Sequence, residues 1–127
     1  MDKNTDSSTF TLQDNADIGT VKIADDVIGM IAALAAMEIE GVSAMAGNIT
    51  TELLGRVGHK NLANGVKVTF EGRSIHVKLA LMMNYGYNIQ TTCQNVQTRV
   101  KNTVENMTGL KVEDVDIRIA GITIPRA

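Results

Sequence analysis

The stretch that most constrains this chain runs from Gly65 to Tyr85, with the sequence GVKVTFEGRSIHVKLALMMNY. Apolar and polar residues alternate on both sides of Glu71-Gly72-Arg73-Ser74, a pattern that predicts a β-hairpin. Its apolar face comprises Val66, Val68, Phe70, Ile75, Val77, Leu79, Leu81 and Met83. An antiparallel pair divided in this way buries one face on a core and leaves the other largely in water. The rest of the chain must therefore cover the apolar face.

Two segments have the apolar spacing of helices that could provide this cover. In residues 25–40, Asp25 and Asp26 lie where the positive end of the helix dipole favours carboxylates, and Gly41 is a typical helix stop. Residues 89–107 predict a second helix, which Thr108 and Gly109 end. The apolar stripes hold Val27, Ile28, Ile31, Leu34, Ala35 and Ile39 in the first helix, and Ile89, Cys93, Val96, Val100, Val104 and Met107 in the second.

Two further segments alternate as strands do. Residues 19–23, GTVKI, place Val21 and Ile23 on one side. The strand after Gly109 has an inward side with Val115, Ile117 and Ile119, and an outward side with Asp114, Asp116 and Arg118. The resulting order, β-α-β-β-α-β, predicts an α+β two-layer sandwich, in which a four-stranded, mostly antiparallel sheet carries both helices on one face.

The chain has the length of a single domain with a polar extension. Residues 1–18 lack an apolar period, so we expect a flexible polar tail there. Residues 19–127 are predicted to form a single α+β domain, because a chain of 127 residues can bury one core. Between them, residues 41–64 contain four glycines and a possible short helix around 50–54. Connections of this length are functional or mobile, and the residues do not decide between the two.

The charge distribution argues against a nucleic acid partner. The net charge is −2, and nucleic-acid-binding proteins normally carry a basic footprint. RNA-recognition domains share the predicted element order, but they stack bases on aromatic residues that face out of the central strands. The outward positions of the hairpin hold residues such as Lys67, His76 and Met82 instead. We therefore expect no nucleic acid partner.

Cysteine use and hydropathy suggest a compartment. Cys93 is the single cysteine and cannot form an internal disulfide, which fits a reducing environment. The longest uncharged apolar run, from Val27 to Met37, is far shorter than the roughly 20 residues that cross a bilayer. The first ten residues lack the basic and apolar regions of a signal peptide. We expect a cytoplasmic protein with no direct membrane span.

The sequence contains no recognisable catalytic, cofactor-binding or metal-binding motif. His59, His76 and Cys93 have unrelated spacings, unlike the clustered ligands of a metal site. The glycine-rich segment 55–61 lacks the Walker spacing of a phosphate loop. His76 could serve in acid–base chemistry only within a concave site, since exposed strands usually carry such residues for solubility. We therefore predict a non-enzymatic protein without cofactor or metal.

Two surfaces are candidates for binding a protein partner. On the first helix, Gly29, Ala33 and Ala36 form a stripe of small residues where a solvated helix would carry lysine and glutamate. This stripe either lies buried inside the domain or forms a subunit contact. The second candidate is the charged outward face of the sheet, represented by Lys78, Asp116 and Arg118.

Beyond these physical arguments, the chain resembles the alkaline shock protein family of Gram-positive bacteria, also called the envelope stress response family. The matching segments, in order, are VKIADDVIGMIAALAAMEIEGVSAM, ELLGRVGHKNLANGVKV, LMMNYGYNI and VENMTGLKVEDVDIRIAGI. Together they cover residues 19–122. The chain departs from the usual pattern at Asp25, where the family often has proline, and in its second helix, which is rich in neutral glutamine and threonine.

The resemblance implies a non-enzymatic protein that binds other proteins as a scaffold in cell-envelope homeostasis. It further implies self-association into a homo-oligomer and a membrane-anchored partner that holds the protein at the inner face of the cell membrane. Some relatives are linked to fatty-acid synthesis, so the alternative is a cytoplasmic regulator of lipid metabolism that binds an enzyme or acyl ligand. An apolar cavity between helices and sheet would favour that alternative.

Overall fold

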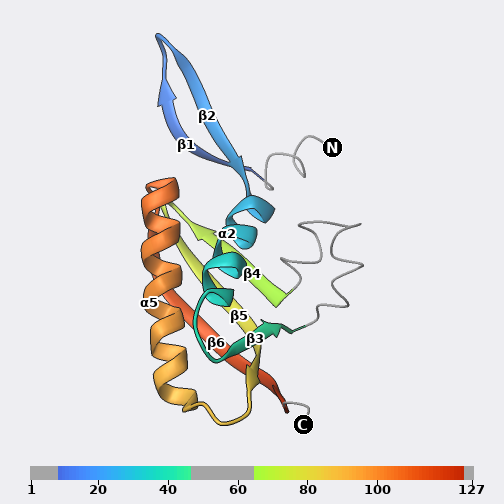
Figure 1. Cartoon of the computed structure of the whole chain (residues 1–127). Helices are drawn as coiled ribbons and strands as arrows, with labels where there is room; N and C mark the ends of the chain where they lie inside the picture. The colour runs from blue at the N-terminus through green and yellow to red at the C-terminus, as the bar shows by residue number, and fades with distance from the viewer. Residues whose placement is uncertain (1–8, 47–64, 125–127) are drawn as a thin grey trace.

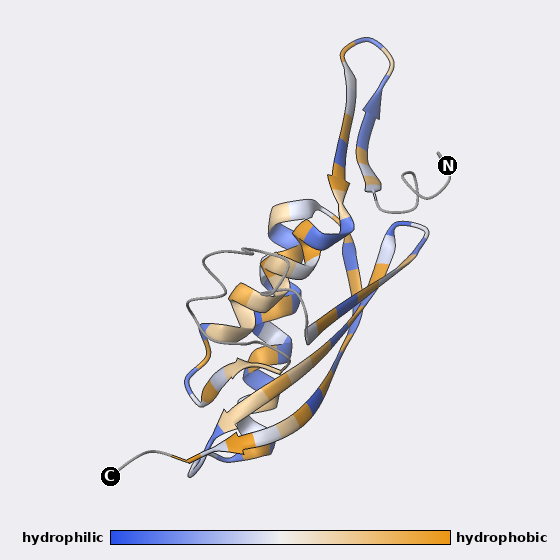
Figure 2. Cartoon of the chain, turned by 90° about the vertical axis from the view of Figure 1, so that its right-hand side faces the viewer, coloured by the Kyte–Doolittle hydropathy of each residue, from blue (hydrophilic) through white to orange (hydrophobic). Residues whose placement is uncertain are grey.

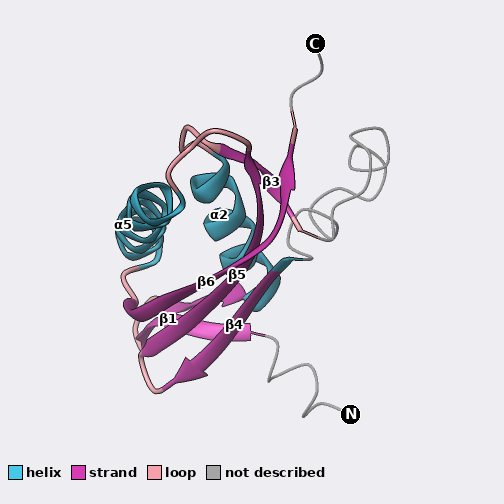
Figure 3. Ribbon diagram, turned by 90° about the horizontal axis from the view of Figure 1, so that it is seen from below, coloured by secondary structure: helices cyan, strands magenta, loops and turns pink. Residues whose placement is uncertain are grey.

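The computed structural model describes residues 9–46 and 65–124 (Figure 1). Its elements are, in chain order, β1 (Thr9–Asn15), β2 (Gly19–Ala24), α2 (Asp25–Met37), β3 (Val42–Met45), β4 (Val66–Glu71), β5 (Ser74–Asn84), α5 (Ile89–Thr108) and β6 (Lys111–Thr123). Strands β3 to β6 form a four-stranded sheet, and both helices lie on one side of it (Figure 2; Figure 3). The predicted α+β class with a mostly antiparallel sheet is confirmed.

Strand β5 is the centre of the sheet. Strand β6 runs parallel to β5 along its whole length, from Ser74 to Asn84. Strands β4 and β3 share the other edge of β5, where both are antiparallel to it: β4 follows residues 74–79 and β3 follows residues 81–83. A two-residue turn joins β4 to β5, and Gly72 in this turn has φ 65°, a conformation that favours glycine. The predicted hairpin is therefore confirmed.

The core lies between the sheet and the two helices. Alternate residues of β5 are buried, as the polar and apolar alternation predicts. Helix α5 adds Val96, Val100 and Val104, and all three are fully buried. Each such side chain stabilises the fold by about 1.5–3 kcal/mol relative to an exposed one. Among residues 9–46 and 65–124, no helix lies on the opposite face of the sheet (Figure 3).

The N-terminal part differs from the sequence prediction. Strands β1 and β2 pair as a separate antiparallel hairpin that extends away from the body (Figure 1). The predicted strand at 19–23 is present as β2, but its partner is β1 and not the main sheet. The predicted flexible tail is wrong for residues 9–18, because the ring of Phe10 stacks on Phe70 with centroids 4.5 Å apart. Arg73 also donates a hydrogen bond to the carbonyl of Leu12. Residues 1–8 lie outside the described part of the chain.

The fourth strand of the main sheet is β3, which falls inside the predicted connection at 41–64. Helix α2 ends at Met37, and Gly41 follows with φ 105°. A Cβ atom on Gly41 would lie 2.9 Å from the ring of Tyr87, so glycine is needed there for both conformation and space. The remainder of the connection, 47–64, including the possible helix around 50–54, lies outside the described residues.

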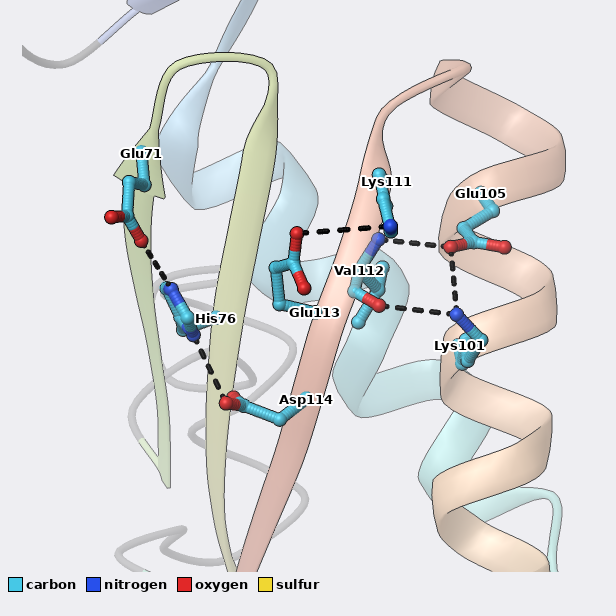
Figure 4. Close-up of polar contacts among 8 residues, drawn as sticks. All are labelled: Glu71, His76, Lys101, Glu105, Lys111, Val112, Glu113 and Asp114. Carbon is cyan, nitrogen blue, oxygen red and sulfur yellow. Dashed lines mark hydrogen bonds and ion pairs between the residues drawn. The ribbon is translucent and has the colours of Figure 1, made fainter.

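Side chains of α5 cover part of the outer edge of β6 (Figure 4). The carboxylate of Glu105 accepts a hydrogen bond from the Val112 N–H at 2.9 Å, and Lys101 donates to the Val112 carbonyl at 3.1 Å. Gln97 donates to the Val115 carbonyl at 3.0 Å. An uncovered edge strand is a template for unwanted pairing, so these contacts protect this part of β6. Asn88 caps the start of the helix, since its side chain accepts from the Thr91 N–H, and Gly109 caps the end in the left-handed conformation.

Candidate functional surface

The outer face of the four-stranded sheet brings together the charged residues that the sequence predicted there. Lys78 on β5 lies opposite Asp116 on β6, and the next outward pair is Ala80 with Arg118. On the other side of β5, Lys67 of β4 lies opposite Lys78. Lys67, Lys78, Asp116 and Arg118 are all exposed. The two strands of the hairpin and β6 thus place three cations and one carboxylate in adjoining positions.

These residues surround a hollow of about 360 Å³. Its lining comprises Gly65, Val66, Lys67, Lys78, Leu79, Ala80, Asp116, Ile117 and Arg118. Gly65 and Ala80 contribute little side-chain volume, which leaves space between the longer charged residues. Gly65 also lies close to Ala46, the residue after β3, since a Cβ atom on it would lie 2.5 Å from the carbonyl oxygen of Ala46. Sequence analysis did not predict the role of Gly65 or Ala80 in shaping the surface.

The small-residue stripe lies in the core. Gly29, Ala33 and Ala36 are buried, and both alanines have no exposed area. As a surface for a partner, this candidate is therefore wrong, and the alternative of burial inside the domain holds. The small side chains let α2 pack closely against its neighbours in the core. As a result, Leu34, which was predicted to face inward, is 50% exposed.

His76 lies between two carboxylates on the same sheet face (Figure 4). Its Nε2 atom is 2.8 Å from Oε1 of Glu71 on β4, and its Nδ1 atom is 3.1 Å from Oδ2 of Asp114 on β6. Hydrogen bonds to Glu71 and then Asp114 raise the pKa of His76 above its usual value of 6.5. Both nitrogens donate in the imidazolium form, so neither is available as a base. The cluster ties three strands together, and His76 does not line the hollow.

Cys93 and the possible metal ligands are the other candidates for chemistry. Cys93 is partly buried, and burial raises the pKa of its thiol, which lowers the population of the reactive thiolate. Within residues 9–46 and 65–124, no group of three or more His, Cys, Asp or Glu side chains could hold a metal ion. His59 falls in the part of the chain that is not described.

Two further hollows bear on the alternative of an acyl ligand. One, of about 170 Å³, is lined by Asp25, Asp26, Gly29, Val66 and Val68. The other, of about 410 Å³, is lined by Ile39, Asn95, Thr98, Arg99 and Asn102. The first lining includes the carboxylates of Asp25 and Asp26, and the second is polar or charged except for Ile39, whereas an acyl chain needs a predominantly apolar lining. Neither hollow favours a lipid regulator.

Comparison with known proteins identifies the family. The pattern of the alkaline shock protein 23 family, described as having a cell envelope-related function, matches residues 13–124. The chain belongs to this family, and the resemblance found in the sequence is confirmed. None of the helices in the described part of the chain has the length and hydropathy of a membrane span.

Three relatives are described as uncharacterized proteins. YqhY of Bacillus subtilis is 36% identical over 105 residues, which cover 83% of this chain and 78% of YqhY. YloU of the same organism is 35% identical over 108 residues, 84% of this chain and 90% of YloU. Spy1614 of Streptococcus pyogenes serotype M6 is 31% identical over 117 residues, 91% of this chain and 97% of Spy1614. Among solved structures, a variant of the MamM C-terminal domain aligns with a TM-score of 0.48 at 10% identity, covering 76% of this chain and 93% of that domain.

Proposed function

We propose that this protein is a non-enzymatic, protein-binding scaffold in cell-envelope homeostasis, and that it binds its partner through the outer face of its four-stranded sheet. Membership of a family with a cell envelope-related function supports the setting. The surface is supported by the grouping of Lys78, Asp116 and Arg118 around a hollow of about 360 Å³. This grouping is the observation that carries the proposal.

The charged residues of this surface differ from those of α5, which form ion pairs. Glu38 pairs with Arg99, and Lys101 pairs with Glu105. In contrast, no ion pair within the described ranges involves Lys67, Lys78, Asp116 or Arg118. Charged groups at interfaces act mainly by selecting and steering partners of complementary charge. A charged, unpaired cluster around a hollow suits that role better than it suits stability.

The non-enzymatic part of the proposal is supported by the state of the reactive side chains. His76 has both ring nitrogens engaged by carboxylates, and the pKa of Cys93 is raised by burial. A general base needs a free acceptor within reach of its substrate, and a thiol nucleophile needs a lowered pKa. Neither condition is met by these two groups.

The proposal includes a location and an assembly. We propose that the partner is a membrane-anchored protein, that it holds this protein at the inner face of the cell membrane, and that the protein self-associates there. Because the buried alanine stripe of α2 is unavailable, self-association would use another surface. We propose the exposed side of α5, which is mostly amide and hydroxyl, as that surface.

The test is affinity purification of the tagged full chain from detergent-solubilised membranes and from the soluble fraction of the cells that make it. Three forms are compared: the wild type, the double variant Lys78→Glu with Arg118→Glu, and the control Lys22→Glu. Lys22 lies on β2, is exposed, and is opposite the uncharged Thr11, so its reversal changes net charge away from the proposed surface.

We expect the wild type and the Lys22→Glu control to recover the same membrane protein in stoichiometric amounts, and the double variant to lose it. Recovery of that protein by the double variant would contradict the choice of surface. Recovery of only soluble lipid-synthesis enzymes by the wild type would contradict the envelope scaffold and support the lipid regulator.

A further inference from the structure

We propose that the hollow on the outer sheet face receives an acidic segment of the partner protein, whose carboxylates bind between Lys67, Lys78 and Arg118. This inference rests on the proposed function and adds the chemistry of the partner. It also adds Lys67 to the binding surface.

Lys67 and Lys78 lie directly opposite one another on the antiparallel strands β4 and β5. Like charges in such cross-strand positions repel and destabilise a sheet. The neighbouring outward pair on this hairpin has no such repulsion, because His76 lies opposite the uncharged Thr69 and is bound by two carboxylates. An anion between the two lysines would turn their repulsion into attraction. A ligand of negative charge at this place would add to the single carboxylate of Asp116, which lies opposite Lys78 on β6.

The third cation is on the other side of the hollow. Arg118 on β6 lies opposite Ala80, is exposed and lines the hollow. Arginine binds carboxylates through two parallel hydrogen bonds, which fixes their orientation as well as their position. Asp116 lies between Lys78 and Arg118 along the lining and is its single acidic residue. The balance of three cations to one carboxylate selects an anionic ligand.

The shape of the site suits a polypeptide segment with acidic side chains. The volume of about 360 Å³ is near the lower end of the range for ligand pockets, which is about 300–1,000 Å³. The aliphatic stems of the two lysines and the methyl of Ala80 give the hollow apolar walls below its charged rim. The carboxylate of an aspartate or glutamate would match the charged rim, and an apolar neighbouring residue would match the walls.

Other occupants match the charge less well. The chain's own residues 47–64 carry Arg56, Lys60 and only one acid, Glu52, so their charge has the same sign as the hollow. A second copy that presented the same face would also bring cations against cations. A partner with clustered aspartate or glutamate is the occupant that charge complementarity favours.

The test uses the full chain and immobilised peptides of one length in three matched sets: acidic residues alternating with valine, the same peptides with glutamine and asparagine in place of the acids, and the same peptides with lysine. Binding is measured at low and high salt for the wild type, Lys67→Glu, Arg118→Glu and the control Lys22→Glu. Thermal melting of each variant shows whether it is folded, and sedimentation gives its oligomeric state.

We expect only the acidic peptides to bind, and we expect high salt to weaken their binding. Lys67→Glu and Arg118→Glu should each weaken it by more than about tenfold, because a partner charge would be left without its counter-charge, while Lys22→Glu leaves it unchanged. Lys67→Glu should at the same time raise the melting temperature, which separates lost binding from lost folding. Failure of every acidic peptide, or equal binding by Lys67→Glu, would overturn the proposal.

Two further outcomes separate this inference from the proposed function. If Lys67→Glu still recovers the membrane partner from cells, the scaffold stands and the acidic-segment site is wrong. If acidic peptides bind but no partner is recovered by the wild type, the site stands and the scaffold is wrong. Dissociation of an oligomer by Lys67→Glu would identify a second copy as the occupant and would also overturn the proposal.

Discussion

Ala33 and Leu34 are neighbours on α2 with opposite surroundings. Ala33 has no exposed area, whereas Leu34 is half exposed. From hydropathy alone the larger residue belongs inside, and the sequence analysis placed it there. The reason for the reversal is space: α2 packs closely against the sheet and α5 only where its side chains are as small as those of Ala32, Ala33 and Ala36.

This contrast gives a direct prediction. Ala33→Glu should lower the free energy of unfolding by at least about 3 kcal/mol, because it adds volume and an uncompensated charge to the core. Leu34→Glu is the matched control on the adjacent residue, and it should stay within about 1 kcal/mol of the wild type. Urea unfolding followed by circular dichroism measures both. Equal effects of the two substitutions would mean that the burial of α2 has been assigned to the wrong side.

His76 is predicted to titrate above 6.5, because Glu71 and Asp114 stabilise its charged form. A raised folded-state pKa means that the stabilisation is fully present below the unfolded value of 6.5 and is lost as pH rises through the folded pKa. The stability difference between the wild type and His76→Gln should therefore shrink as pH rises through that range.

The titration of the His76 ring is followed by NMR. The wild type is expected to give a midpoint above 6.5, and Glu71→Gln combined with Asp114→Asn is expected to bring it back down. A wild-type midpoint at or below 6.5 would show that the two carboxylates do not hold the ring in solution.

At the scale of elements, α5 and β6 are joined by Glu105. Its pKa is lowered, first by the hydrogen bond from the Val112 N–H and then by Lys101. Its contribution to stability is therefore present above the unfolded value of 4.5 and lost as pH falls through the folded pKa. Glu105→Ala should lower the free energy of unfolding by about 1 kcal/mol at neutral pH, because it leaves the Val112 N–H without its partner. The loss is no larger because the carboxylate is partly exposed.

Glu113 provides the control for Glu105. It is the next acidic residue along the chain and lies on β6. Its Oε2 atom is 4.0 Å from Nζ of Lys111 at the surface (Figure 4). Exposed pairs of this kind contribute little, so Glu113→Ala should leave the unfolding free energy nearly unchanged. A larger loss for Glu113→Ala than for Glu105→Ala in chemical denaturation would contradict the role given to the helix–strand contact.

In the hairpin of β4 and β5, one substitution is expected to raise the free energy of unfolding. Lys67→Glu replaces a pair of like charges by a pair of opposite charges, and it should stabilise the fold by about 0.2–1 kcal/mol. Lys22→Glu, opposite the uncharged Thr11, should have no comparable effect. Both are measured by urea unfolding at low salt. A stabilisation that persists at high salt would point to a cause other than the charge of Lys78.

The elements themselves were predictable to different degrees. The hairpin and the two helices have clear periodicities, and the two-residue turn sets a register that already places Lys67 opposite Lys78. Strand β3 is four residues long and is held by its pairing with β5, which local sequence does not reveal. Strand β1 pairs with β2, and it contacts the body through the stacking of Phe10 on Phe70, two residues that are far apart in the chain.

At the scale of the whole molecule, the two faces of the sheet have separate roles. One face and both helices make the core, and the other face presents charged residues around a hollow. The alternation of strand residues predicted that Lys78, Asp116 and Arg118 would share the outer face. It could not predict the hollow, because this depends on the pairing of β5 with β6 and on the close approach of Gly65 to Ala46.

Differential lysine modification of the free and partner-bound protein tests whether the outer sheet face binds the partner. Acetylation is followed residue by residue by mass spectrometry. The account predicts that partner binding protects Lys67 and Lys78 and leaves Lys22 and Lys111 as reactive as in the free protein. Protection of Lys101 on α5 with unchanged reactivity of Lys67 and Lys78 would contradict it and move the binding surface to the helical side.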